Sequence, residues 1–295
     1  MPAAPFARVD HLVIAVRDLV AAERAYAALL GREPSTRGAH PGLGTTNVVF
    51  GLANCYLELL ALDGTPPSHP LAHGLAAFLE GTPEGILALA LGSDDLDETA
   101  RALRAAGTDV GTETTVTTTV PAGGTRATRL LPIAREHTRG VNVFAVQHAH
   151  DVIPPAPWLG DPAAGVAAVD HVVLFSDDLD GALRLWRDAF AIPERWRREF
   201  TERGTVNVGL RLGGITLELV APLGAAAGER GERLWGIAYT VEDGDAAVAR
   251  LRAQGGETSD ARPGLAPGTR VATVKWRDRL PTLLIQHTSH TRHTR

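Results

Sequence analysis

The chain repeats itself at one fixed offset, and this repeat constrains the fold more than any other feature of the sequence. The segment VDHLVIAV from Val9 matches VDHVVLFS from Val169, and LELLA from Leu57 matches LELVA from Leu217. Separate blocks that match without a gap are not expected by chance, so the chain is a duplication of one folding unit. Its 295 residues are also enough for two domains.

Each half contains a weaker inner repeat in the form of a strand, a turn and a helix. The segment GILALALGSDDLDETARALRAAG from Gly85 has the form of the chain's opening, and LWGIAYTVEDGDAAVARLRAQGG from Leu234 has it in the second half. Asp18, Asp95 and Asp178 stand where a helix N-cap belongs. Short β-rich segments follow each helix. The pattern predicts an α+β fold of four βαβββ modules, paired into two domains.

The domain boundaries follow from these modules. Between the two halves, AHDVIPPAPWLGDPAAG carries four prolines and little periodicity, as a linker would. The polar C-terminal segment lacks apolar periodicity and is expected to be a flexible tail. The expected boundaries are 1–148 for domain 1 (modules 1–84 and 85–148), 149–165 for the linker, 166–288 for domain 2 and 289–295 for the tail.

Composition excludes several classes of protein. The net charge of -5 is mild and spread along the chain. The sequence has no cluster of Lys and Arg that would predict a surface for nucleic acid or a membrane. The sequence contains no run of 18 apolar residues, which a membrane-spanning helix would need. The N-terminal residues lack the apolar stretch of a signal peptide, and Cys55 is the lone cysteine. We therefore expect a cytoplasmic protein whose partner is a small molecule, with a homodimer as a further option.

His11 and Glu58 are the first candidates for chemistry. Both lie in otherwise apolar strand segments, where an unpaired polar side chain is costly. A divalent metal would satisfy both, since imidazole and carboxylate together suit iron, manganese, zinc, cobalt or nickel. The alternative is a hydrogen bond between the two across the sheet.

Four βαβββ units that open with VDH and carry LEL resemble the vicinal oxygen chelate superfamily. The first half is similar in particular to its glyoxalase-like group, whose signature is His-Pro-Gly-x-Gly-Thr, then Asn, then Tyr-Leu-Glu-Leu. The matching residues here are His40, Pro41, Gly42, Gly44, Thr45, Asn47, Tyr56, Leu57, Glu58 and Leu59. The resemblance implies two open barrels, each made of two modules, with metal ligands on the first and last strands of the modules.

By this resemblance His11 and Glu58 match the ligand positions of the first module. The second module departs from the pattern, because Ala88 stands where a histidine is expected. Its last strand offers Gln147 and His148, of which only one should face the site, since neighbouring strand residues point to opposite sides. The expected set is His11, Glu58 and either Gln147 or His148, completed by water.

A second site is expected at equivalent positions in the second half, from His171, Glu218 and His287 beside Gln286. Both halves could bind metal, or only one could have kept the ancestral site. We favour the first half, because His40 is replaced by Phe200 in the second.

Further roles are assigned around the first site. His40 is a candidate acid, base or substrate donor, or a surface histidine in a loop. Glu58 could act as a base rather than a ligand. Asn47, which recurs as Asn207, could contact substrate from its strand or mark a bulge, and Tyr56 is assigned to substrate binding.

The leading functional hypothesis is a metal-dependent lyase or isomerase of the glyoxalase type, acting on a small oxygenated metabolite. An extradiol-type dioxygenase is less favoured, because Gly236 and Gln286 stand where its second histidine and its glutamate should be. The alternative from another class is a non-catalytic protein that binds or sequesters a small molecule.

Overall fold

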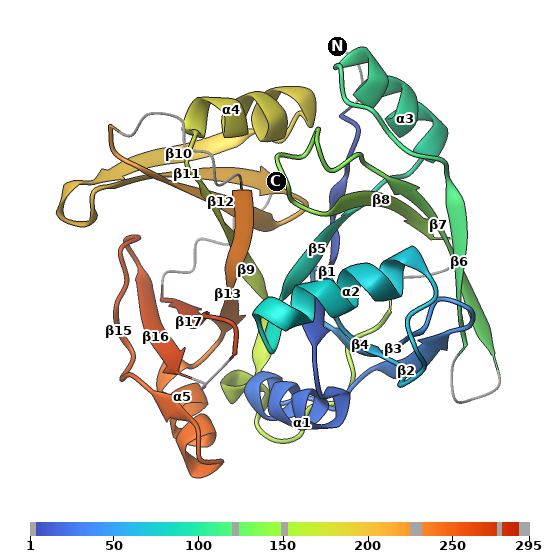
Figure 1. Ribbon diagram of the computed structural model, residues 1–295. Coiled ribbons are helices and arrows are strands. Elements are labelled where there is room, and N and C mark those ends of the chain that lie inside the picture. The colour runs from blue at the N-terminus through green and yellow to red at the C-terminus, as the bar shows by residue number, and fades with distance from the viewer. Residues whose placement is uncertain (1–3, 120–123, 149–152, 225–231, 276–278, 289–295) are drawn as a thin grey trace.

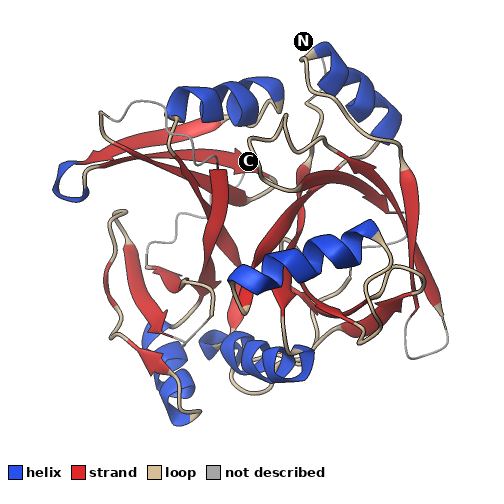
Figure 2. Ribbon diagram, in the orientation of Figure 1, coloured by secondary structure: helices blue, strands red, loops and turns tan. Residues whose placement is uncertain are grey.

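The computed structural model describes residues 4–119, 124–148, 153–224, 232–275 and 279–288. The predicted tail and the first four residues of the predicted linker lie outside this part of the chain. Within it, the α+β class is confirmed, and each half is built from two modules of the βαβββ type, with one additional two-residue strand in the last module (Figure 2).

The first half forms a closed eight-stranded barrel in the order β1-β4-β3-β2-β6-β7-β8-β5. Its β1 is parallel to β4 and antiparallel to β5, so the first strands of the two modules lie side by side (Figure 1). The bridge between Ala39 and Thr119 joins β2 to β6. The strands are β1 Arg8–Val16, β2 Thr36–His40, β3 Thr45–Gly51, β4 Tyr56–Leu62, β5 Glu84–Gly92, β6 Thr114–Thr119, β7 Thr125–Pro132 and β8 Val143–His148.

The module helices begin at aspartates, as the sequence indicates. Asp18 caps α1 (Leu19–Leu30) by accepting a hydrogen bond from the Ala21 backbone, and Asp95 caps α3 (Leu96–Ala105) in the same way. Such a cap satisfies one of the free N–H groups at a helix start. Asp178 repeats the cap in the second half, on α4 (Leu179–Leu183).

One helix of the first half was not predicted. Helix α2 (Pro70–Gly81) follows β4, begins after His69 and lies across one end of the barrel (Figure 1). Leu71, Leu75 and Phe78 are among its residues that line the barrel interior. None of the helices in the described part of the chain is both long and apolar enough to span a membrane.

The second half forms an open sheet in the order β10-β11-β12-β9-β13-β17-β16-β14, with β15 paired to β16. The part of α4 that continues to Ala189 is a π-helix, Arg184–Ala189, and α5 spans Gly244–Ala253. The strands are β9 Val166–Ser176, β10 Glu194–Phe200, β11 Thr205–Leu212, β12 Ile215–Pro222, β13 Glu232–Val241, β14 Glu257–Thr258, β15 Arg262–Pro263, β16 Thr269–Lys275 and β17 Thr282–His287.

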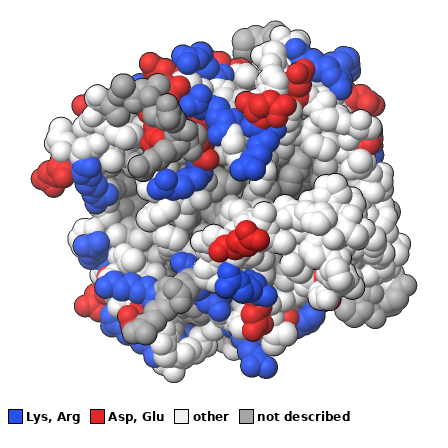
Figure 3. Space-filling view, viewed as in Figure 1, with Lys and Arg blue, Asp and Glu red and all other residues white. Residues whose placement is uncertain are grey.

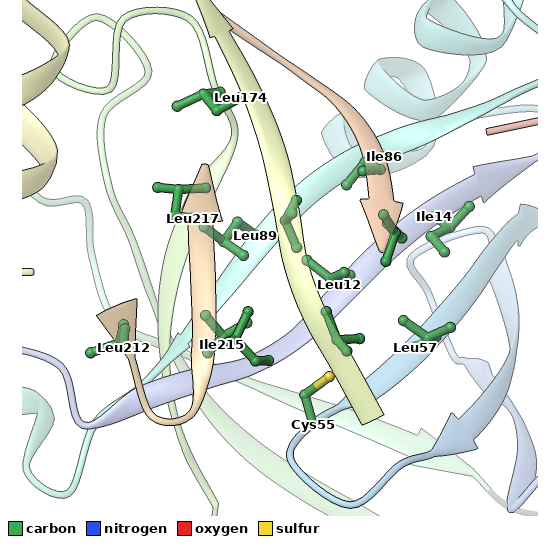
Figure 4. Close-up of a cluster of buried hydrophobic side chains, with 14 of the residues drawn as sticks. Leu12, Ile14, Cys55, Leu57, Ile86, Leu89, Leu174, Leu212, Ile215 and Leu217 are labelled. Atoms are coloured by element: carbon green, nitrogen blue, oxygen red, sulfur yellow. The ribbon is translucent and has the colours of Figure 1, made fainter. Parts of the chain in front are cut away.

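The two halves pack through the outer faces of their sheets. Leu12 and Ile14 of β1 lie in one hydrophobic cluster with Leu174 of β9 and Leu217 of β12 (Figure 4). Because strand residues alternate between two faces, sending Leu12 and Ile14 into this cluster turns His11 toward the interior of the barrel. Packing between the halves thus determines which residues face the cavity.

Two partly buried ion pairs, each with a buried glutamate, cross the same interface reciprocally. Arg139 of the first half donates to Glu232 of the second at 2.6 Å, and Arg279 of the second donates to Glu84 of the first at 2.7 Å. Trp186 also donates to Glu232. Burial raises the pKa of Glu232, while hydrogen bonds from Trp186 and Arg139 oppose the rise without cancelling it. Each half therefore completes a buried carboxylate of the other.

Candidate functional site

The closed barrel contains a cavity of about 740 Å³. Its wall is built from alternate strand residues, with α2 across one end. Tyr56, Glu58 and Leu60 of β4 all line it, as their period of two requires. Most of the wall is apolar, and the surface over α2 is largely uncharged, whereas charges gather over α3, α4 and α5 (Figure 3).

A polar cluster stands on one wall of this cavity, centred on Glu58. Oε2 of Glu58 lies 3.7 Å from Nε2 of His11, and its Oε1 lies 3.7 Å from Nε2 of His40. Asn47 donates from Nδ2 to Oε1 of Glu58 at 2.5 Å. Four of the residues expected from sequence are thereby brought together. His40 is buried at the end of β2, so it is not the surface loop residue that was one option.

His11 is oriented by a residue that the sequence analysis did not assign to the site. Its Nδ1 lies 2.8 Å from Oδ1 of Asp10. A carboxylate only accepts hydrogen bonds, so Nδ1 of His11 donates to Asp10, and this contact leaves Nε2 directed toward Glu58. A register shift between Val9 and His11 in the pairing with β5 falls at Asp10. The signal was the aspartate of VDH, present in both halves.

Asp10 is buried with several cationic or donor groups around it. Nε2 of His148 lies 2.9 Å from its Oδ1, and Nε of Arg8 lies 3.5 Å from its Oδ2. Burial alone would raise the pKa of Asp10, but the hydrogen bonds from His11 and His148 outweigh it and hold that pKa well below its ordinary value. Asp10 therefore stays ionised and fixes both rings.

The expected third ligand is not brought to the cluster. Gln147 accepts from Arg129 at 2.6 Å and donates to the backbone oxygen of Asp94, away from His11. The contacts of His148 are with Asp10 and with Thr128, whose Oγ1 lies 3.3 Å from its Nδ1. One of these two residues was expected to be a metal ligand, but Nε2 of His148 is hydrogen-bonded to Asp10 instead.

Tyr56 completes the surroundings of His11. Its ring stacks on the imidazole, with 4.3 Å between centroids and 14° between planes. Burial, with the negative charges of Asp10 and Glu58, raises the pKa of Tyr56 well above its ordinary value. The hydroxyl thus remains a neutral donor at the cavity wall.

The second half repeats most of this arrangement. His171 lies 2.9 Å from Asp170 through Nδ1 and 3.2 Å from Glu218 through Nε2, and Asn207 donates to Glu218 at 2.7 Å. His287 binds Asp170 at 2.8 Å, as His148 binds its aspartate. Burial lowers the pKa of His171. The contacts with Asp170 and Glu218 raise this pKa by more than burial lowers it, so the net shift is upward.

The two clusters differ in enclosure. In the second half the sheet is open, and the side chain of His287 is half exposed. Phe200 stands at the position of His40. Only the first cluster therefore combines two imidazoles around its glutamate with a closed barrel.

The chemistry of the first cluster suits a divalent metal, but its geometry is incomplete. His11, His40 and Glu58 supply the imidazole and carboxylate donors that such metals take. His11 also has the carboxylate partner on its other nitrogen that is typical of metal-bound histidine. The described residues, however, include no group of three His, Cys, Asp or Glu side chains already arranged to hold an ion.

Comparison with known proteins gives one curated relative and several solved structures. The chain is 39% identical over 80 residues, 26% of its length, to an ethylmalonyl-CoA/methylmalonyl-CoA epimerase of Cereibacter sphaeroides. The match covers 54% of that enzyme, so the chain spans about half the length of the curated relative.

Solved structures match over almost the whole chain. A mutant of 4-hydroxymandelate synthase from Streptomyces coelicolor has a TM-score of 0.70 at 18% identity, covering 98% of this chain and 94% of that one. A hypothetical protein from Staphylococcus aureus has a TM-score of 0.60 at 12% identity, covering 94% and 98%. At these identities the likeness shows the fold alone.

Family models match both halves. Residues 170–273 match the glyoxalase/bleomycin resistance protein/dioxygenase superfamily, and residues 9–168 match the glyoxalase-like domain. Because the second of these matches covers more than half of the chain, the protein belongs to the glyoxalase-like domain family of the vicinal oxygen chelate superfamily.

Proposed function

We propose that the first barrel is the active site of a metal-assisted lyase or isomerase that moves a proton on a small oxygenated metabolite. One observation carries the proposal: Glu58 lies between the imidazoles of His11 and His40 on the wall of a mostly apolar cavity. Acid–base side chains gathered on the wall of such a pocket are typical of catalytic sites.

The metal would be held by His11 and Glu58, with water completing its coordination. When bound, it would polarise a carbonyl oxygen of the substrate and so make a proton on the neighbouring carbon more acidic. Gln147 and His148 are left out of this set, because their polar atoms are engaged elsewhere.

The chain's own residues would handle the proton. One oxygen of Glu58 takes a hydrogen bond from Asn47, which fixes the carboxylate and leaves the other oxygen toward His11. His40 lies on the far side of Glu58 and could return the proton or pass it on. The neutral hydroxyl of Tyr56 donates to Asp10, so Tyr56 would contribute its ring to the wall that faces the substrate.

Proton transfer is favoured over ring cleavage because the curated relative is named as an epimerase. An epimerase removes and returns a proton at one carbon, and such a step needs only an acid–base pair near a polarised carbonyl. A second candidate function is binding without catalysis. It is favoured by the lack of a preassembled three-ligand group in the described residues.

The first test is elemental analysis of tag-free protein that ends before His290, with His11→Ala and His171→Ala as matched variants from the two halves. We expect about one equivalent of metal, lost with His11→Ala and kept with His171→Ala. Failure to take up iron, manganese, zinc, cobalt or nickel after anaerobic reconstitution would remove the metal-assisted enzyme and leave the binding protein.

The second test follows proton exchange directly. The metal-loaded protein is incubated in deuterated buffer with a panel of 2-oxo acids and malonyl-type thioesters, and loss of the α-proton signal is followed by NMR. Glu58→Gln should abolish the exchange while the metal content is measured in parallel. Exchange that is unchanged in Glu58→Gln would contradict the role given to this carboxylate.

A further inference from the structure

Arg126 lies on the cavity side of β7. It alternates with Thr128 and Leu130, and all three line the cavity. Arg129, on the opposite face of the same strand, binds Glu113 and Gln147 with its guanidinium. The strand thus presents one arginine to each side of the barrel wall, and the two differ in their partners.

The guanidinium of Arg126 has no hydrogen bond or ion pair with any residue that the structure describes. Its charge still reaches the polar cluster. Burial is the main cause of the raised pKa of Tyr56, and the positive charge of Arg126 opposes that rise. An unpaired cation therefore stands within electrostatic range of the Tyr56 hydroxyl.

The charged side chains that line the cavity are few, and they differ in how they are engaged. The fully charged side chains that line it are Arg126, Arg135 and Glu58. Glu58 is already engaged by Asn47 and flanked by imidazoles. Asp10, ionised behind His11, offsets one of the two cations, so the positive charge that lacks a partner among the described residues lies at Arg126, where it favours an anionic ligand.

We propose that Arg126 recognises a carboxylate of the substrate, so that the protein acts on an acid with an apolar body. The inference rests on the proposed function and names its substrate class. The oxygenated end would lie at Glu58, the apolar body against Phe78 and Phe144, and the carboxylate at Arg126, near the hydroxyl of Thr118.

A carboxylate fits better than a phosphate group. One guanidinium binds a planar carboxylate through two parallel hydrogen bonds. A phosphate dianion is usually held by several donors, often at a helix N-terminus or a nest of backbone N–H groups. Among the described cavity residues, Arg126 is flanked instead by two threonine hydroxyls, Thr118 and Thr128.

The test compares a carboxylate probe with its neutral analogue. Binding of 4-phenylbutyrate and of 4-phenylbutanamide is measured by calorimetry on the full chain as purified, and again after treatment with EDTA. We expect Arg126→Gln to weaken binding of the acid by about tenfold or more, and to change binding of the amide by less than about twofold. Arg126→Lys should restore part of the affinity, since it keeps the charge but loses the paired geometry.

Arg135→Gln is the matched control. It removes the same charge from the cavity lining, but Arg135 is exposed and its Nε binds the backbone oxygen of Gly140. Equal weakening by the two substitutions would overturn the specific contact, and so would an acid affinity that Arg126→Gln leaves unchanged. Failure of wild-type protein to bind the acid would also overturn it. Because the result after EDTA should be the same, loss of the metal proposal would not alter this outcome.

Discussion

Arg139→Met should destabilise the protein strongly near neutral pH and much less in mild acid. The substitution removes the cation that crosses from the first half to Glu232, whose side chain is fully buried. Trp186 and Ser176 would remain as its hydrogen-bond partners. Leaving a buried carboxylate without its cation typically costs about 3–5 kcal/mol.

Protonation of Glu232 limits this cost. The pKa of Glu232 is already raised by burial from its ordinary value of 4.5, so the folded variant can take up a proton. Between pH 4.5 and pH 7 that uptake costs at most about 3.4 kcal/mol, and at about pH 5.5 at most about 1.4 kcal/mol. At roughly 2 °C per kcal/mol, the melting temperature should fall by up to about 7 °C at pH 7 and about 3 °C at pH 5.5.

The direction of this pH dependence follows from the linkage between proton binding by Glu232 and the free energy of unfolding. A group whose pKa is raised in the folded state stabilises the fold below its unfolded pKa, and the stabilisation is lost as pH rises through the folded pKa. Removing Arg139 raises that folded pKa further, so the variant should lose stability faster above pH 4.5 than the wild type does. Differential scanning calorimetry across this range measures the difference.

Two variants make the reasoning refutable. In a Glu232→Gln background, Arg139→Met should have the same cost at pH 5.5 and at pH 7, since its other partner, Asp178, has a lowered pKa and stays ionised over this range. Arg135→Met, an exposed arginine in the same segment, should change the melting temperature little at any pH. A cost of Arg139→Met that is equal at pH 5.5 and pH 7 in the wild-type background would show that the buried charge is not its origin.

Two further predictions concern the sites. The pKa of His287 is raised from 6.5, mainly by its hydrogen bond to Asp170. This contact stabilises the fold fully below pH 6.5, and the stabilisation is lost as pH rises through the raised pKa of folded His287. His287→Gln should therefore lower the melting temperature more at about pH 6 than at about pH 9. Gly38→Ala would place a Cβ 2.5 Å from the side chain of Thr118, and it should lower the free energy of unfolding, measured by urea titration, by about 1–3 kcal/mol. Gly74→Ala, which has open space around it, should not lower the free energy of unfolding in the same measurement.

The local parts of the fold were predictable because they depend on short-range rules. Asp18 and Asp178 cap helices at equivalent positions, and the repeat from Val9 to Val169 fixes two copies of one module. Asn47 stood out because asparagine is unfavourable in a strand, and the structure places it on Glu58.

The parts that were missed depend on how distant strands meet. Whether Gln147 or His148 approaches the cluster is set by the pairing of β8 with its neighbours and by the irregular pairing around Asp10. A period of two assigns faces but does not show which acceptor lies opposite. The covering of the cavity by α2 was missed because its sequence has no equivalent in the module repeat.

The duplication bears on which half contains the proposed active site. Asp10 is buried and Asp170 is partly buried, and in each case hydrogen bonds from two histidines lower the pKa of the carboxyl, so the shared Asp–His pairs have a structural reason to persist in each half. Their presence cannot distinguish a working site from an inherited one. The features found in one half alone can: a second imidazole at Glu58, a closed barrel covered by α2, and an arginine that faces its interior and has no partner among the described residues. All three belong to the first half, and each can be removed without touching the shared pairs.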